Sequence, residues 1–155
     1  MPIHLDITHT STIKLAVPVD EAYAYCTNVE KSIPDNFPGL EKFEKLKDDT
    51  YRWSFKEIAF SNQKLKLQLV TRFDRLNPFR MRVTPVEVSG TGTSSLRGEW
   101  QFEPLSAGCQ LSFGVQLSTE LPLPALLKAV VAPIAKAEVA KLFDRYLQNV
   151  AKALT

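Results

Sequence analysis

Only two histidines, His4 and His9, occur in the 155 residues of the chain, and Asp6 lies between them. Imidazole and carboxylate groups are zinc ligands, so this spacing raises the question of a metal site. Side chains of a β-strand alternate between its two faces, which places His4 and Asp6 on one face and His9 on the other. We therefore interpret the three residues as solvated strand residues and predict no metal ion and no cofactor.

The chain lacks the short motifs of nucleophilic or phosphate chemistry. It contains no G-x-S-x-G sequence of the kind that presents a catalytic serine on a sharp turn. The stretch GTGTSSLRG (90–98) has no G-K-[ST] ending, and we predict a loop between two strands there. Cys26 and Cys109 are far apart in the sequence, and we predict two buried free thiols.

Glu57 is the acidic residue that best fits a chemical role. It follows Tyr51, Trp53 and Phe55 at the spacing of one strand face, so a strand that continues to it would turn its carboxylate inward. Removed from water there, the carboxylate would serve as a proton-transfer group or as a hydrogen-bond partner of a ligand. The alternative is that the strand ends before Glu57.

The elements that position these residues follow from periodicity and from turn-forming residues. Residues 3–17 alternate as one strand, and residues 17–33, followed by two prolines, predict one or two short helices. Residues 40–119 divide into six strands, and one long helical run, 121–154, follows. The predicted turns between these six strands are residues 47–50, 60–63, 76–79, 89–92 and 104–108.

The composition is that of a globular protein. With 45% hydrophobic and 23% charged residues and a net charge of +2, the chain is neither disordered nor fibrous. It has no apolar run of about 18 residues that would span a membrane, and its first residues lack the pattern of a signal peptide. We expect a single domain, residues 1–155, in the cytoplasm.

Several predicted strands alternate between apolar and polar side chains, which indicates a sheet with one buried and one wet face. The buried rows contain Tyr51, Trp53, Phe55, Leu67, Leu69, Thr71, Met81, Val83, Trp100, Phe113 and Val115. Helices gathered on one face of an antiparallel sheet define an α+β fold, in which the terminal helix covers the buried face.

This order of elements resembles the START-like, or SRPBCC, helix-grip superfamily. VPVDEAYAYCTNVEKSIPDNFPGLEKFEKL (17–46) is similar to its segment of proline, acidic residues, short helix and Pro-Gly, and GEWQFEPLSAGCQLSF (98–113) to its Trp-containing hairpin. The resemblance implies a seven-stranded curved antiparallel sheet wrapped around a long C-terminal helix, with two short helices between strands one and two. It also implies a cavity between sheet and helix that holds a hydrophobic molecule.

A carrier or accessory protein for a hydrophobic small molecule or lipid is therefore the leading hypothesis. The expected ligand contacts are the residues of the buried rows together with Glu57, Val130 and Ile134. One alternative is an enzyme similar to polyketide cyclases, aromatases or dehydratases, for which only Tyr51, Thr71 and Glu57 are suitable inward polar groups. Another is an adaptor that docks on a membrane or a partner, resembling the carbon monoxide dehydrogenase branch of the superfamily. We favour binding over catalysis.

The wet face of the predicted sheet is basic and carries Arg52, Lys56, Lys64, Lys66, Arg72, Arg80, Arg82 and Arg97. We expect a solvated face, with transient docking on an anionic membrane as the alternative. Nucleic acid is not an expected partner, because the aromatic side chains that would stack on bases lie in the buried rows.

The terminal helical run changes its apolar face at Pro133. The residues of the earlier face are Leu126, Leu127, Val130, Val131 and Ile134, and the later apolar set, 139–150, is centred about half a turn away. An interior proline kinks a helix, so we predict a bend or break within about one turn before Pro133, with the later half packed on the sheet. The earlier half would be a cavity lid, a surface for a membrane or for a second copy in a homodimer, or a helix buried on all sides.

Overall fold

The computed structural model describes residues 3–60, 63–87 and 94–155, and for residues 58–60 and 63–65 it describes the backbone alone. The elements, in chain order, are β1 (Ile3–Leu15), α1 (Val19–Thr27), α2 (Val29–Asn36), β2 (Leu40–Lys47), β3 (Thr50–Phe55), β4 (Ile58–Phe60), β5 (Gln63–Leu65), β6 (Gln68–Leu76), β7 (Arg80–Pro85), β8 (Ser95–Pro104), β9 (Cys109–Leu121), the short 3₁₀ helix η1 (Ala125–Leu127) and α3 (Lys128–Ala153).

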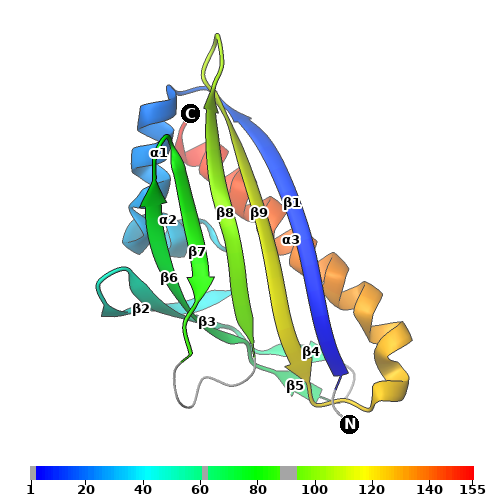
Figure 1. Cartoon of the computed structure of the whole chain (residues 1–155). Coiled ribbons are helices and arrows are strands. Elements are labelled where there is room, and N and C mark those ends of the chain that lie inside the picture. Colours follow the sequence, from blue (N-terminus) through cyan, green and yellow to red (C-terminus); the bar gives the residue numbers. More distant parts are fainter. Residues whose placement is uncertain (1–2, 61–62, 88–93) are drawn as a thin grey trace.

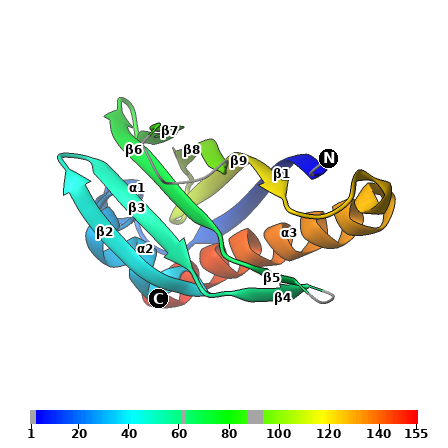
Figure 2. The same cartoon turned by 90° about the horizontal axis from the view of Figure 1, so that it is seen from below.

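Seven of the strands form one antiparallel sheet in the order β1-β9-β8-β7-β6-β3-β2. β1 and β9 pair along their whole length, from Ile3 opposite Leu121 to Leu15 opposite Cys109. Figure 1 shows α3 running diagonally across one face of this sheet, and Figure 2 shows the sheet curving around it. The predicted α+β architecture, with two short helices between β1 and β2 and a long helix at the end, is confirmed.

The strands on either side of residues 56–67 are shorter than predicted. β3 ends at Phe55 and β6 begins at Gln68, and between them β4 and β5 form a separate two-stranded sheet. Two-stranded ribbons twist more strongly than wide sheets, and Figure 2 shows this ribbon leaving the main sheet. Of the two alternatives for Glu57, the one in which the strand ends before this residue is therefore confirmed, because Lys56 and Glu57 are where the chain leaves β3.

The predicted turns at residues 47–50, 76–79 and 104–108 are confirmed. The turn predicted at residues 60–63 joins β4 to β5, although residues 61–62 lie outside the described part of the chain. The turn predicted at residues 89–92, and with it most of the predicted loop at residues 90–98, falls in the undescribed segment 88–93.

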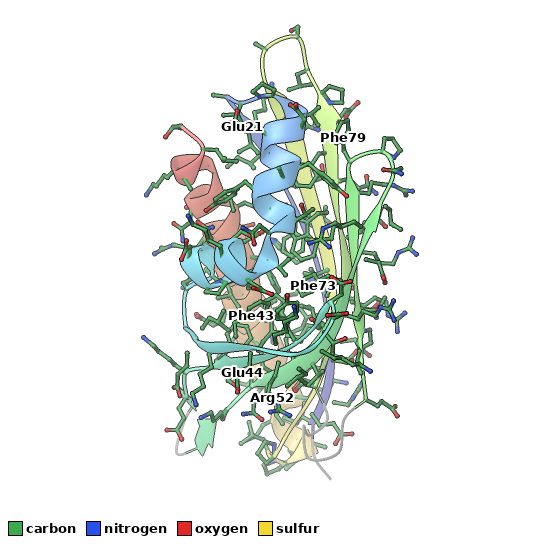
Figure 3. All side chains as sticks on the ribbon, turned by 90° about the vertical axis from the view of Figure 1, so that its left-hand side faces the viewer. Glu21, Phe43, Glu44, Arg52, Phe73 and Phe79 are labelled. Atoms are coloured by element: carbon green, nitrogen blue, oxygen red, sulfur yellow. The ribbon has the colours of Figure 1, made fainter. Side chains whose placement is uncertain are left out.

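The core is an aromatic cluster that fills the space between the sheet and the helices. The rings of Trp53 and Phe73 stack with centroids 6.0 Å apart, and those of Trp100 and Phe113 are 4.2 Å apart. Phe43 of β2 points into the same space, with its ring centroid 6.3 Å from that of Phe73 (Figure 3). The alternation of the strands therefore builds the inner layer that the sequence predicts.

Tyr146 of α3 ties the helix to this cluster. Its ring stacks on Phe37 with centroids 4.1 Å apart, and its hydroxyl accepts a hydrogen bond of 3.0 Å from Nε1 of Trp100. Tyr146 and Trp100 are both fully buried, so neither polar group has water as a substitute partner. Burial also raises the pKa of Tyr146 well above its usual range.

We expect Tyr146→Phe to lower the free energy of unfolding by about 2 kcal/mol, because the indole N–H of Trp100 is then left buried without its acceptor. Urea denaturation measures the loss. The matched control is Tyr23→Phe, which removes a hydroxyl that donates to the backbone oxygen of Arg80 at a part-buried position. Equal losses in the two variants would contradict the role given to the Trp100 contact.

The predicted break before Pro133 is wrong, because α3 continues from Lys128 through Pro133 to Ala153. Pro133 lies early in the helix, and the backbone hydrogen bond that it lacks would have gone to the carbonyl of Ala129 in the first turn. One helix also suffices for packing. Val131 packs in the core, the small residues Ala132 and Ala135 pack against it, and the later apolar set follows along the same helix.

Cys26 and Cys109 are buried free thiols, as predicted. Burial raises the pKa of Cys26 to about 12. A thiol with so high a pKa carries almost no thiolate at neutral pH, and the thiolate is the reactive form of cysteine. Both side chains are therefore packing residues of the core.

Candidate functional site

A cavity of about 320 Å³ lies between α3 and the inner face of the sheet. Its walls are mostly apolar and come from the α2–β2 loop, from β3 and the residues after it, from β6, β8 and β9, and from the middle of α3. The lining residues are Pro38, Gly39, Trp53, Phe55, Lys56, Glu57, Leu67, Leu69, Leu96, Leu117, Glu138, Val139, Leu142 and Phe143.

Five of the predicted ligand contacts line this cavity. They are Trp53, Phe55, Glu57, Leu67 and Leu69, from β3, β6 and the chain next to them. These residues come together because β3 and β6 are paired neighbours, with Trp53 opposite Leu69. The backbone N–H of Phe55 also donates to the carbonyl oxygen of Leu67 at 3.0 Å.

The other predicted contacts lie elsewhere. Tyr51, Thr71, Met81, Val83, Trp100, Phe113 and Val115 are buried side chains that are not among the cavity-lining residues. Thr71 is engaged as a structural partner, since Nε1 of Trp53 donates to its hydroxyl at 2.7 Å. Val130 and Ile134 are 63% and 44% exposed, respectively, and do not line the cavity either.

The sequence did not identify most of the α3 residues that line the cavity as ligand contacts. Val139, Leu142 and Phe143 belong to the later apolar face of the terminal helix, which was expected to pack on the sheet, so their periodicity was the available signal. Leu96 and Leu117 stand in inward rows of β8 and β9 in the same way. The sequence gives no sign of which core positions border empty space, because that depends on how closely α3 approaches the sheet.

Charged side chains stand at the rim of the apolar cavity. Lys56 and Glu57 lie where the chain leaves β3, and both are exposed. Glu138 of α3 is on the opposite wall, where its carboxylate accepts a hydrogen bond of 3.3 Å from Lys141. The arrangement suits an apolar molecule with a polar end, because the interior offers only packing while the rim offers charges and hydrogen bonds.

Tyr51 is buried near the start of β3 and is not among the cavity-lining residues. Its hydroxyl donates a 2.8 Å hydrogen bond to the carboxylate of Glu30 in α2. Desolvation, followed by this contact, raises the pKa of Tyr51 to about 12, and the same hydrogen bond lowers the pKa of Glu30. The pair therefore holds α2 against β3 rather than facing the cavity.

A second polar cluster, which the sequence analysis did not foresee, joins β1 to α3. Nε2 of His9 lies 2.8 Å from Oδ1 of Asp144 and 2.9 Å from Oγ of Ser11, and the Ser11 hydroxyl also donates to Asp144. A catalytic triad uses one ring nitrogen for the serine and the other for the carboxylate. Here a single nitrogen meets both groups, so the cluster is a clasp between the strand and the helix.

The contact between His9, Ser11 and Asp144 predicts that the folding stability of the protein depends on pH in the acidic range. Partial burial raises the pKa of Asp144, but the hydrogen bonds of Ser11 and His9 and the charge of His9 outweigh it, so that the pKa is lowered from the ordinary 3.8. The unfolded chain then binds a proton more readily than the folded one. The stability from this contact is complete above pH 3.8 and is lost as the pH falls toward the folded value.

We therefore expect Asp144→Asn to lose less stability than the wild type when the pH is lowered from neutral to about 3, since it has no carboxylate to protonate. Urea denaturation at a series of pH values measures the two slopes. Asp74→Asn, which removes the partner of Arg72 on the outer face, is the control. Parallel curves for Asp144→Asn and the wild type would contradict the clasp.

The other two candidate metal ligands lie on the opposite side of β1. His4 and Asp6 share its outer face, where Nε2 of His4 lies 3.3 Å from Oδ2 of Asp6. His9 faces α3 instead, as the alternation predicts. The hydroxyl of Ser118 donates to Asp6 at 2.5 Å, and this hydrogen bond lowers the pKa of the carboxyl. The three residues are thus divided between the two faces of the strand.

The outer face of the sheet carries acidic as well as basic side chains. Oε1 of Glu99 lies 3.3 Å from Nη1 of Arg80, and its Oε2 lies 3.9 Å from Nη2 of Arg82. Glu44 lies opposite Arg52 on the neighbouring strand (Figure 3). Lys66 and Arg72 also have carboxylates beside them. Lys56 and Arg97 are exposed, and the structure does not describe the side chain of Lys64. The predicted basic face is therefore a face of mixed charge.

None of the helices in the described part of the chain is long and apolar enough to span a membrane.

A curved antiparallel sheet that holds a long terminal helix over an apolar cavity is the architecture of helix-grip proteins. The model of the polyketide cyclase/dehydrase and lipid transport family matches residues 6–155, and the chain belongs to this family. The predicted membership of the START-like superfamily is thereby confirmed. No protein among the curated ones matches the chain.

Solved structures share the fold at low sequence identity. A START superfamily protein from Mycobacterium smegmatis has a TM-score of 0.64 and 14% identity, over 96% of this chain and 99% of that one. A STAR-related lipid transfer protein from Xanthomonas axonopodis has a TM-score of 0.63 and 12% identity, over 95% and 85%. The di-domain aromatase/cyclase StfQ of the steffimycin biosynthetic pathway has a TM-score of 0.63 and 15% identity, over 97% of this chain and 51% of that one.

Proposed function

We propose that the protein binds one compact hydrophobic molecule in the cavity between α3 and the sheet, and that it acts as a carrier or accessory protein. The observation that carries this proposal is the cavity itself, with its apolar walls and its charged rim. Sites for small molecules in proteins have this composition and a volume of about 300–1,000 Å³. The family's description as cyclases and lipid transport proteins agrees with it.

The size of the cavity suits a small ligand. Its volume of about 320 Å³ lies at the lower end of the range for small-molecule sites. A single acyl chain or a molecule of two or three fused rings is the kind of ligand that we expect. The carboxylates of Glu57 and Glu138 and the ammonium of Lys56 would contact the polar end of the ligand.

Binding is favoured over cyclase chemistry by the state of the inward polar groups. Catalysis of that type needs acids and bases that contact the substrate. Thr71 and Tyr51 are engaged in hydrogen bonds inside the protein, to Trp53 and Glu30, and neither lines the cavity. Glu57 is the remaining predicted acid or base, and a carboxylate exposed at the rim suits recognition of a ligand's polar end.

The test is a fluorescence titration with N-phenyl-1-naphthylamine, a neutral apolar probe, combined with solvent extraction of the freshly purified protein. We expect saturable binding of one probe per chain, and competition by any apolar molecule that the extract contains. An extract free of apolar molecules, together with fluorescence that rises without saturation, would overturn the proposal.

A further inference from the structure

A polar pocket of about 340 Å³ lies on the outer face of the sheet, where β2, β3 and β6 are neighbours. Its volume is that of a small-molecule site, and it shares no lining residue with the apolar cavity. The two sites are nevertheless built on the same strands. Trp53 and Leu69 are paired and line the cavity, whereas Ser54 and Gln68, the next pair, line the outer pocket.

A β-bulge in β2 forms one wall of the outer pocket. Leu40 pairs with Phe55 and Lys42 pairs with Ser54, so Glu41 is an extra residue on the β2 side. Two consecutive residues of a regular strand point to opposite faces, but a bulge changes the direction of the side chains next to it. Glu41 and Lys42 therefore both line the same pocket. Bulges are frequent next to active sites, where they re-aim a side chain.

Ser54 offers a hydrogen-bond donor to this pocket. It stands in the middle strand, directly between Lys42 and Gln68, and is 4% exposed. Nε2 of Gln68 donates to its oxygen at 3.4 Å, and no residue in the described part of the chain accepts the proton of the Ser54 hydroxyl. Buried polar groups normally have hydrogen-bond partners. The free proton is therefore available to an acceptor atom of a ligand.

Five charged side chains surround Ser54. They are the cations Lys42, Arg52 and Lys66 and the carboxylates Glu41 and Glu44. Among these five groups one ion pair forms in the described structure, in which Nζ of Lys66 lies 3.9 Å from Oε1 of Glu41. Arg52 and Glu44 are cross-strand neighbours (Figure 3), but their charged groups do not come within ion-pair distance.

Charges elsewhere on the outer face neutralise one another at close range, since Glu99 contacts both Arg80 and Arg82. In the outer pocket, Arg52 and Glu44 line the same hollow without meeting, so the pocket presents a cation and an anion to a molecule that enters it. An anion alone would be repelled by the carboxylate, and a cation alone by the guanidinium. A molecule with both charges is complementary to the two groups.

A carboxylate suits the cationic side of the pocket better than a phosphate. The planar guanidinium of Arg52 matches the two oxygens of a carboxylate, and Ser54 and Lys42 add donors beside it. A phosphate monoester has almost two negative charges and would meet stronger repulsion from Glu41 and Glu44.

We propose that the outer pocket binds a small amino carboxylate, a molecule with one carboxylate and one protonated amine. The carboxylate contacts Arg52 and Lys42 and accepts the proton of Ser54, and the ammonium group contacts Glu44. The site is separate from the cavity, so this proposal stands whether or not the cavity binds a ligand.

NMR titration of the isotope-labelled protein with β-alanine tests the proposal, at constant ionic strength because salt screens exposed charges. We expect saturable changes in the amide chemical shifts of Arg52, Ser54 and Gln68. Propionate and ethylamine each carry one of the two charged groups of β-alanine on an ethyl group. Each should bind at least about fivefold more weakly than β-alanine.

Two variants test the roles of the charges. Glu44→Gln should weaken β-alanine binding by about fivefold and strengthen propionate binding, because the carboxylate attracts the amine but repels the anion. Arg52→Gln should weaken the binding of both molecules by about tenfold or more. The matched control is Arg82→Gln, on the outer face but outside this pocket, which should bind β-alanine as the wild type does.

Shift changes that grow without saturation would overturn the proposal, and so would propionate binding as tight as that of β-alanine. A Glu44→Gln variant that changes both affinities in the same direction would contradict a ligand of both charges. Displacement of N-phenyl-1-naphthylamine by β-alanine would place the site in the cavity instead, since the two sites share no lining residue.

Discussion

Leu142→Trp is expected to weaken the binding of N-phenyl-1-naphthylamine by at least about tenfold, a loss of about 1.4 kcal/mol or more. Leu142 lies on α3 and lines the cavity, where the longer indole side chain would occupy space that the probe needs. Filling a cavity with apolar atoms commonly stabilises a protein, so the free energy of unfolding should stay the same or rise. Fluorescence titration and urea denaturation measure the two quantities.

Val130→Trp is the matched control for this variant. It introduces the same side chain on the same helix, at an exposed position that does not line the cavity. Probe binding should remain at the level of the wild type. The cavity would be the wrong site if Val130→Trp weakened binding as much as Leu142→Trp, or if neither variant weakened it.

Gly108→Ala is expected to lower the free energy of unfolding by about 3 kcal/mol or more. Gly108 is in the turn between β8 and β9 with a positive φ of 85°, which L-residues with a side chain seldom adopt. A methyl group there would also collide with the carbonyl oxygen of Leu15, at the end of β1. The substitution therefore strains the backbone and disturbs the pairing of β1 with β9.

Gly39→Ala separates these two effects. Gly39 has a similar φ of 76°, but a methyl group added to it meets no atom within 4 Å. Only the conformational cost remains, and we expect a loss of about 1 kcal/mol. Urea denaturation of both variants decides the matter, and equal losses would show that the contact with Leu15 does not matter.

The sheet could be predicted from the sequence because its strands obey a simple rule. Large apolar residues alternate with polar ones in β3, β6, β8 and β9, and the same residues form the inner layer of the structure. Alternation alone left the end of the strand at Phe55 undecided, since the alternation continues to Glu57, whereas in the structure β4 and β5 pair as a separate ribbon.

The helix was harder to predict because apolar residues are not always buried. The prediction of a break treated Leu126, Val130 and Val131 as one apolar face that needed its own partner, whereas only Val131 packs in the core. Alanines complete the contact with the sheet, and a small residue gives a weaker signal than an exposed leucine. That hydrophobic residues lie inside is a tendency that does not hold for each residue.

Both the clasp and the cavity depend on contacts that local sequence patterns do not contain. His9 and Asp144 are 135 residues apart, and nothing near either residue indicates the clasp that joins them. Trp53, Phe55, Leu67 and Leu69 follow from alternation, which finds inward residues but does not distinguish packed positions such as Met81 from those beside the cavity. The distance between α3 and the sheet makes that distinction.

Methyl-resolved NMR of the protein saturated with N-phenyl-1-naphthylamine tests the central proposal most directly. We predict that the largest changes in chemical shift fall on the methyl groups of Leu69, Leu96, Leu117, Val139 and Leu142, which line the cavity. The methyl groups of Leu126, Val130 and Ile134 on the outer side of the helix should change little. Shifts concentrated on those three residues, with the cavity methyl groups unchanged, would contradict the proposal that the cavity is the binding site.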